Sequence, residues 1–235
     1  MGLNDKILVI SDTHFPYEHP DCIQFLKALN KKHRFTRVIH IGDEIDSHGA
    51  SFHEKDPDLY SAGHELSLAV KKLKPLYDLF SAVDVLDSNH GALFRRKIKH
   101  HQLPSNVLKS NQEILEAPAG WRWFDELIIK LPTGQKCLFF HGKNSDPLKV
   151  SKALGVCTVN GHFHTQFSIQ KWSSPVSSNW SMVVGCLIDP KSRAYYYQKN
   201  DLLKPVIGCG MILNGIPRLE LMQMDKEGRW TGKIS

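Results

Sequence analysis

The stretch RVIHIGDEID, residues Arg37–Asp46, joins an apolar run to a polar turn that contains two aspartates. The apolar half is rich in β-branched residues and is typical of a buried strand. The polar half begins with Gly-Asp, which by itself indicates only a turn. In α/β proteins, however, ligands bind at the carboxyl ends of the strands. The stretch therefore predicts a strand with a candidate site at its end.

The same pattern recurs at four other places in the first two thirds of the chain. Each apolar run ends in a carboxylate, an amide or an imidazole. Taken singly, each such end is also typical of a turn, a loop or a hydrogen-bonded core histidine. Together they would converge at one edge of a sheet and could supply oxygen and nitrogen ligands there. The polar residues at the five strand ends are Asp12 and His14, Asp43 and Asp46, Asn89 and His90, His141, and His162 and His164.

The order of elements near the N-terminus predicts an α/β fold with parallel strands. Strands are expected at residues 6–10, 37–41 and 83–87, where short runs are apolar. Amphipathic helices are expected between them, at residues 21–32 and 61–80. Alternating strands and helices of this kind favour parallel pairing.

The remainder of the chain predicts a second sheet. A hairpin is expected at residues 127–131 and 136–140, with strands at 156–164 and 180–187. An Asn-Gly pair at 214–215 lies between two apolar runs, which indicates another hairpin. We expect residues 1–235 to form a single domain, with a β-rich C-terminal extension over about 166–235 that carries no recognisable motif.

Composition favours an intracellular protein. No apolar run approaches the roughly 20 residues of a membrane helix, and the N-terminal residues lack the apolar region of a signal peptide. The five cysteines form no CxxC pair, which is typical of buried, reduced thiols in the cytoplasm. A net charge of +6 favours anionic partners without identifying one.

The ordered series D-x-H, G-D-x-x-D, N-H, H-G and G-H-x-H, between residues 12 and 164, resembles the calcineurin-like metallophosphoesterase superfamily. The chain is also similar to small bacterial and phage phosphoesterases, relatives of the double-strand-break repair nucleases. The resemblance implies a four-layer α-β-β-α sandwich of two mixed sheets flanked by helices. It implies a hydrolase of phosphate esters but does not select the substrate, because the superfamily includes protein phosphatases, nucleotidases, cyclic-nucleotide phosphodiesterases and nucleases.

The resemblance further implies two divalent metal ions that share one carboxylate. Such a pair would make a bridging hydroxide available near neutral pH for attack on a phosphodiester or phosphomonoester. The implied set contains no thiolate, which suits Mn²⁺ first, with Fe, Zn²⁺ or Ni²⁺ as alternatives. The implied ligands are Asp12, His14, Asp43 and His164 for the first ion, and Asp43, Asn89, His141 and His162 for the second.

Two further residues have implied catalytic roles. His90 would act as a general acid or as a charged group that stabilises the transition state. Asp46 would accept a hydrogen bond from His90, although an N-cap position is the structural alternative. The chain also departs from the superfamily pattern, with Ser88 in place of the usual glycine and Gly91 in place of an acidic residue. Ser47 and Gly91 together disfavour a phosphoprotein phosphatase.

Candidate substrate contacts come from two polar segments. The basic segment that follows His90 is either a phosphate contact or a solvated helix face. The histidine-containing segment 48–64 is expected to form a rim of the site. The candidate substrate-binding residues are Arg95, Arg96, His48 and His53.

Three functional hypotheses follow. A DNA-acting nuclease is favoured by the positive charge and by the basic segment after His90. A phosphatase or phosphodiesterase of small nucleotides is favoured by a short chain with no evident DNA-capture domain. A catalytically inert binding subunit is disfavoured, because all seven implied ligands and His90 are present. The oligomeric state is not encoded in any motif.

Overall fold

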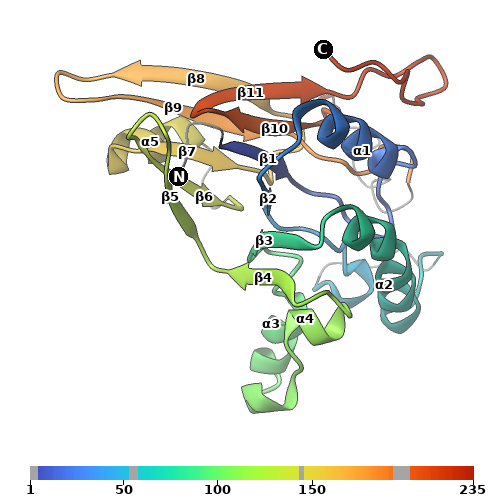
Figure 1. The fold of residues 1–235 in the computed structure, drawn as a ribbon. Helices are drawn as coiled ribbons and strands as arrows, with labels where there is room; N and C mark the ends of the chain where they lie inside the picture. The colour runs from blue at the N-terminus through green and yellow to red at the C-terminus, as the bar shows by residue number, and fades with distance from the viewer. Residues whose placement is uncertain (1–4, 53–57, 143–145, 193–201) are drawn as a thin grey trace.

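The computed structural model describes residues 5–52, 58–142, 146–192 and 202–235. These residues form two mixed β-sheets packed against each other, with helices on the outer faces (Figure 1). The predicted class, an α/β sandwich of two mixed sheets flanked by helices, is confirmed.

The first sheet has six strands. Strands β1 to β4 run parallel to one another. Strand β10 pairs antiparallel with β1, and β11 pairs antiparallel with β10. The predicted Asn214–Gly215 hairpin is confirmed as the turn between these last two. In spatial order the strands are β11 (Ile216–Leu221), β10 (Gly208–Leu213), β1 (Lys6–Ile10), β2 (Arg37–His40), β3 (Ala82–Leu86) and β4 (Gly120–Phe124).

The second sheet has five strands and begins with the predicted hairpin at residues 127–140. Strands from the C-terminal third of the chain lie within both sheets, because β9 pairs with β7 while β10 pairs with β1. In spatial order the strands are β5 (Leu127–Lys130), β6 (Lys136–Phe140), β7 (Cys157–Asn160), β9 (Ser178–Val184) and β8 (Phe167–Ser173).

The helices cover both outer faces. Helices α1 and α2 pack on the first sheet, and α5 packs on the second. Pro75 lies inside α2 without ending it. No described helix has the length and apolar character needed to cross a membrane. The helices are α1 (Cys22–His33), α2 (Ala62–Leu79), α3 (Leu93–His100), α4 (Asn111–Ile114) and α5 (Pro147–Leu154), with 3₁₀ turns η1 (His48–Ala50) and η2 (Ser105–Val107).

Both faces of strand β1 are buried, which explains why its sequence is apolar throughout. Ile7 and Val9 pack in the core between the two sheets, while Leu8 and Ile10 pack in the core beneath α1 and α2. A central strand with both faces buried requires a continuous apolar run. The same arrangement brings the polar residues that follow β1, β2 and β3 to one edge of the first sheet, next to the ends of β6 and β7.

Two predicted strands end earlier than expected. The strand predicted at 156–164 stops at Asn160, because the following residues turn into the candidate site. The strand predicted at 180–187 stops at Val184, where Gly185 adopts a φ of +68° that an extended strand does not allow.

Candidate metal centre

The loops after β1 and β2 are joined by backbone hydrogen bonds. The Asp12 N–H donates to the Gly42 carbonyl at 3.2 Å, and the His14 N–H donates to the Asp43 carbonyl at 2.9 Å. Asp12, His14 and Asp43 are all buried. The third loop is anchored by the His90 N–H, which donates to Asp43 Oδ1 at 3.1 Å. Three strand ends are therefore held in one fixed arrangement.

Backbone strain is concentrated in these loops. Nine described non-glycine residues have a positive φ, and four of them are candidate ligands. Such conformations cost roughly 1 kcal/mol or more and persist where the surroundings impose them, often at functional sites. The strained ligand residues, with their φ angles, are Asp12 (50°), His14 (49°), Asp43 (51°) and His162 (68°).

One group of donors gathers Asp12, His14 and His164. The Nε2 atom of His164 lies 3.1 Å from Asp12 Oδ1 and 3.3 Å from His14 Nε2. The approach requires Gly161, because a Cβ at this position would lie 1.8 Å from Ser11 Oγ. The three side chains each offer a donor atom within 4.8 Å of the others, which is close enough to surround one cation.

A second group gathers Asp43, His141 and His162, with donor atoms again within 4.8 Å of one another. His141 Nε2 lies 3.2 Å from Asp43 Oδ2 and 2.7 Å from Asn89 Oδ1. The backbone N–H of His162 donates to Asp12 Oδ2 at 2.9 Å, which links this loop to the first group. Asp43 also forms a group with His14 and His90, so it lies between the two clusters.

Two of the buried histidines have a fixed orientation. Nδ1 of His14 lies 2.7 Å from Asp46 Oδ1, and Nδ1 of His141 lies 2.7 Å from the Ile41 carbonyl. Both partners are acceptors, so Nδ1 carries a proton whether the ring is neutral or charged, and Nε2 is the atom that faces the other donors. Histidines that bind metals are oriented in this way by a carboxylate or carbonyl behind the ring.

The electrostatics of the cluster favour charged side chains. Burial opposes ionisation of Asp43, yet the charges of His141 and His90 hold the pKa of Asp43 far below its usual value. Burial also disfavours a charged His141, but Asp43 raises the pKa of His141 to about 9. Burial opposes ionisation of Asp12 as well, and hydrogen bonds with His14 and His164 keep its pKa well below the usual range. The carboxylates therefore form a strongly attractive site for cations.

Ser88 connects two of the loops. Its buried hydroxyl accepts the Asp43 N–H at 2.8 Å and the Gly91 N–H at 3.1 Å. A glycine at position 88 would leave both donors without this acceptor. Gly42 makes room for the serine, since a Cβ there would lie 2.5 Å from Ser88 Cβ. The signal in the sequence was the serine that replaces the usual glycine, but only the structure shows what it binds.

Asp46 makes a different contact from the one expected. Its carboxylate accepts a hydrogen bond from His14, not from His90, because Nδ1 of His14 lies at 2.7 Å and Nδ1 of His90 at 3.7 Å from Oδ1. His90 instead bonds through Nδ1 to the backbone carbonyl of Asp46. The rings of His14 and His90 meet edge to face with centroids 4.8 Å apart. Asp46 thus touches both histidines, one with its side chain and one with its backbone.

The candidate substrate residues differ in where they lie and in what they contact. His48 lies in η1, where its backbone N–H donates to Glu65 Oε1 at 2.8 Å. Arg95 does not face the donors, because its guanidinium pairs with Asp87 and bonds Asn111 Oδ1 at 3.1 Å. Arg96 lies on α3 with its guanidinium 5.4 Å from the centre of the Phe52 ring.

His53, the fourth candidate substrate residue, lies outside the described residues.

The donor set fits hard or borderline divalent cations. It combines carboxylate, amide and imidazole donors with no thiolate, and all five cysteines lie elsewhere as buried free thiols. Asp43 lies between the clusters and is grouped with donors from each of them. The residues that would hold them are Asp12, His14, Asp43, Asn89, His141, His162 and His164.

No protein-family model matches the sequence, and no curated protein matches it. Among solved structures, vacuolar protein sorting 29 from Cryptosporidium parvum has a TM-score of 0.52 at 14% identity, over 99% of this chain and 95% of that chain. Vps29 from Chaetomium thermophilum has a TM-score of 0.52 at 10% identity, over 100% and 95%. YfcE, a phosphoesterase from E. coli, has a TM-score of 0.49 at 14% identity, over 96% of each chain.

At such low identity these similarities concern the fold alone. They extend over nearly the whole chain and include both sheets. The chain shares its fold with these Vps29 structures, and it is the α/β sandwich of two mixed sheets that the ordered motifs predicted.

Proposed function

We propose that this protein is a hydrolase of phosphate esters that works with two divalent cations. The observation that carries the proposal is the convergence of donors from five strand ends into two clusters with Asp43 between them. Within them, Nε2 of His14 and Nε2 of His141 are both aimed inward by acceptors behind the rings. If these residues served only packing, the fold would not require acceptors that orient both Nε2 atoms toward the other donors.

The cations would supply two effects when bound. They would acidify a water molecule near neutral pH and would offset negative charge on the phosphate oxygens. Mn²⁺ is the first ion to test, because oxygen and imidazole donors both suit it. Asp43 would partly compensate both charges, and Asn89 would contribute a carbonyl oxygen without adding negative charge.

His90 is placed to handle the proton of the leaving group. Its Nδ1 faces the Asp46 carbonyl, which can only accept, so Nδ1 keeps its proton. Nε2 is then the nitrogen that can carry and release a second proton. The ring is partly exposed, with 27% of the side chain accessible, so a substrate can reach it. We assign His90 the role of general acid at the departing oxygen.

A catalytically inert binding subunit is the alternative. Vps29, which shares the fold, is named for vacuolar sorting, so the fold by itself selects neither function. The complete donor set and the strained backbone at four ligand positions favour catalysis, because a binding surface elsewhere on the fold would not maintain that strain.

The test is hydrolysis of bis-p-nitrophenyl phosphate and p-nitrophenyl phosphate by metal-free protein to which Mn²⁺, Zn²⁺, Fe²⁺ or Ni²⁺ is added back. We expect metal-dependent release of p-nitrophenol, faster from the diester, and its near loss in Asp43→Asn. Asp84→Asn is a matched control, because Asp84 is a buried aspartate that pairs with Arg37 and Arg122 away from the donors. Absence of hydrolysis with every ion, or equal rates in wild type and Asp43→Asn, would contradict the proposal.

A further inference from the structure

The segments that continue two of the metal loops form a patch that the proposed chemistry does not use. Phe52 lies six residues after Asp46, and α3 begins at Leu93, three residues after His90. Helix α3 extends away from the two sheets, at the bottom of Figure 1. The patch therefore begins beside the metal centre and leads outward from it.

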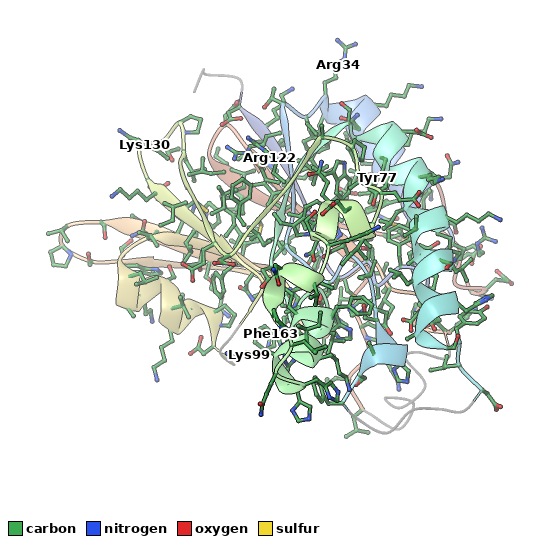
Figure 2. All side chains as sticks on the ribbon, turned by 90° about the horizontal axis from the view of Figure 1, so that it is seen from below. Arg34, Tyr77, Lys99, Arg122, Lys130 and Phe163 are labelled. Carbon is green, nitrogen blue, oxygen red and sulfur yellow. The ribbon has the colours of Figure 1, made fainter. Side chains whose placement is uncertain are left out.

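The charge on α3 is positive along its whole length. The helix carries Arg95, Arg96, Lys97 and Lys99 and no acidic residue. Arg95 is neutralised by Asp87. Within the described part of the chain, the other three cations have no acidic partner. Figure 2 labels Lys99 on this helix, in the view from below.

An exposed aromatic ring lies among these cations. Phe52 has 44% of its surface accessible. Nζ of Lys97 lies 3.8 Å and Cζ of Arg96 lies 5.4 Å from the centre of its ring. The ring of His100 meets it edge to face at 5.7 Å. We define these residues, together with Lys99, as the α3–Phe52 patch.

We propose that the α3–Phe52 patch binds a single-stranded polynucleotide whose scissile phosphate lies at the metal centre. The inference rests on the proposed function and names its substrate class. Unpaired cations beside an exposed aromatic ring match both parts of such a ligand, since the cations attract its phosphates and the ring stacks on a base. Eight helical residues extend about 12 Å, which reaches beyond a single nucleotide.

A single strand fits better than a duplex. A flexible strand can follow the helix away from the metal centre and expose an unpaired base to Phe52. In a duplex the bases are already stacked and paired. A small nucleotide held at the metal centre would leave most of the patch without a ligand. The patch thus favours a polynucleotide over a mononucleotide as substrate.

The first test removes the unpaired charges with the variant Arg96→Ala/Lys97→Ala/Lys99→Ala. The control, Lys27→Ala/Lys31→Ala/Lys71→Ala, removes the same charge from exposed positions on α1 and α2. Binding of a fluorescent oligo-dT is measured by anisotropy over a range of salt, without divalent metal so that no cleavage occurs.

We expect the α3 variant to bind more weakly. The slope of log K against log[salt] should become less negative by about 0.7 for each phosphate contact removed, or by about 2 for all three. The control should keep the wild-type slope. Equal slopes in all three proteins, or equal losses in the two variants, would overturn the proposal.

The second test concerns the ring. Phe52→Ala should weaken oligo-dT binding by about 5- to 150-fold, the range for loss of one base stack, and Phe52→Tyr should retain it. Binding of the matched duplex should be weaker than that of the single strand and insensitive to Phe52→Ala. A duplex that binds as tightly as the single strand, with the same sensitivity, would contradict the proposal.

Bis-p-nitrophenyl phosphate separates this inference from the proposed function. The diester is too small to reach from the metal centre along α3, so its hydrolysis by the wild type tests the metal centre independently of the patch. Retained diester hydrolysis with unchanged DNA binding would reject the patch alone. Absence of diester hydrolysis in the wild type would reject the proposed function, whatever the binding data show.

Discussion

Asp46 orients His14: Oδ1 of the carboxylate lies 2.7 Å from Nδ1 of the ring, and both side chains are buried. The same residue contacts Nδ1 of His90 through its backbone carbonyl. One short loop after β2 thus fixes the direction of a candidate metal ligand and of the candidate general acid.

The first prediction follows from this contact. Asp46→Ala removes the acceptor behind His14, so His14 Nε2 loses its fixed direction, and we expect metal affinity to fall by about 10- to 100-fold. Asp46→Asn keeps an acceptor oxygen and should lie between Ala and wild type. Isothermal titration calorimetry with Mn²⁺ measures the change, and circular dichroism checks that the variants are folded. Wild-type affinity in Asp46→Ala would show that the contact does not position His14.

The second prediction concerns Ser88. Ser88→Ala removes the hydroxyl that accepts from Asp43 and Gly91, so the two loops lose a shared anchor. We expect weaker binding of the ion that Asn89 would help to hold, with the other ion affected less. Competition between Mn²⁺ and a chelating dye would resolve the two affinities. If Ser88→Ala loses thermal stability while both Mn²⁺ affinities stay unchanged, Ser88 stabilises the fold but does not contribute to metal binding.

The third prediction separates proton transfer from metal binding. His90→Asn removes a ring nitrogen that can release a proton and should lower kcat by about 10²–10⁴-fold. The metal content should stay at the wild-type level, because His90 is not in the implied ligand set. A useful control is His64→Asn, since His64 is an exposed histidine near the start of α2. If His90→Asn hydrolyses substrate at the wild-type rate, His90 is not the general acid.

The fourth prediction is a pH dependence of metal binding. Although burial opposes it, the charge of Asp43 raises the pKa of His141 to about 9 in the metal-free protein. Below this pH the ring holds a proton on Nε2, and a cation must displace it. We therefore expect affinity to rise with pH between 6 and 9, by about tenfold per pH unit for one displaced proton.

The measurement is calorimetry at pH 7.5 in buffers with different ionisation enthalpies. Proton release should make the apparent binding enthalpy depend on the buffer. A binding enthalpy that is the same in every buffer would show that no proton leaves on binding.

The sequence was sufficient to predict two sheets and most of their strands, but not β4 or β8. Buried strands require apolar runs, and the polar residue at the end of each run is visible in the sequence. The implied ligands at the ends of β1, β2, β3, β6 and β7 do come together in the structure. Their assignment to particular metal ions stays a prediction.

The connections between these residues were not predictable. The direction of the Asp46 carboxylate depends on how the loops after β1 and β2 pack, and both His14 and His90 lay within reach. Arg95 was expected at the substrate, but Asp87 and Asn111 hold it elsewhere. Such contacts depend on side-chain distances of a few ångströms, which spacing along a chain does not specify.

The two clusters are proposed to hold two divalent cations around Asp43. The most direct test is the metal content of Mn²⁺-loaded, desalted protein, measured by inductively coupled plasma mass spectrometry. We predict two ions per chain in the wild type and a loss from both sites in Asp43→Asn, with Asp84→Asn unchanged. A wild-type protein that retains no metal after loading, or an Asp43→Asn variant that retains both ions, would contradict this proposal.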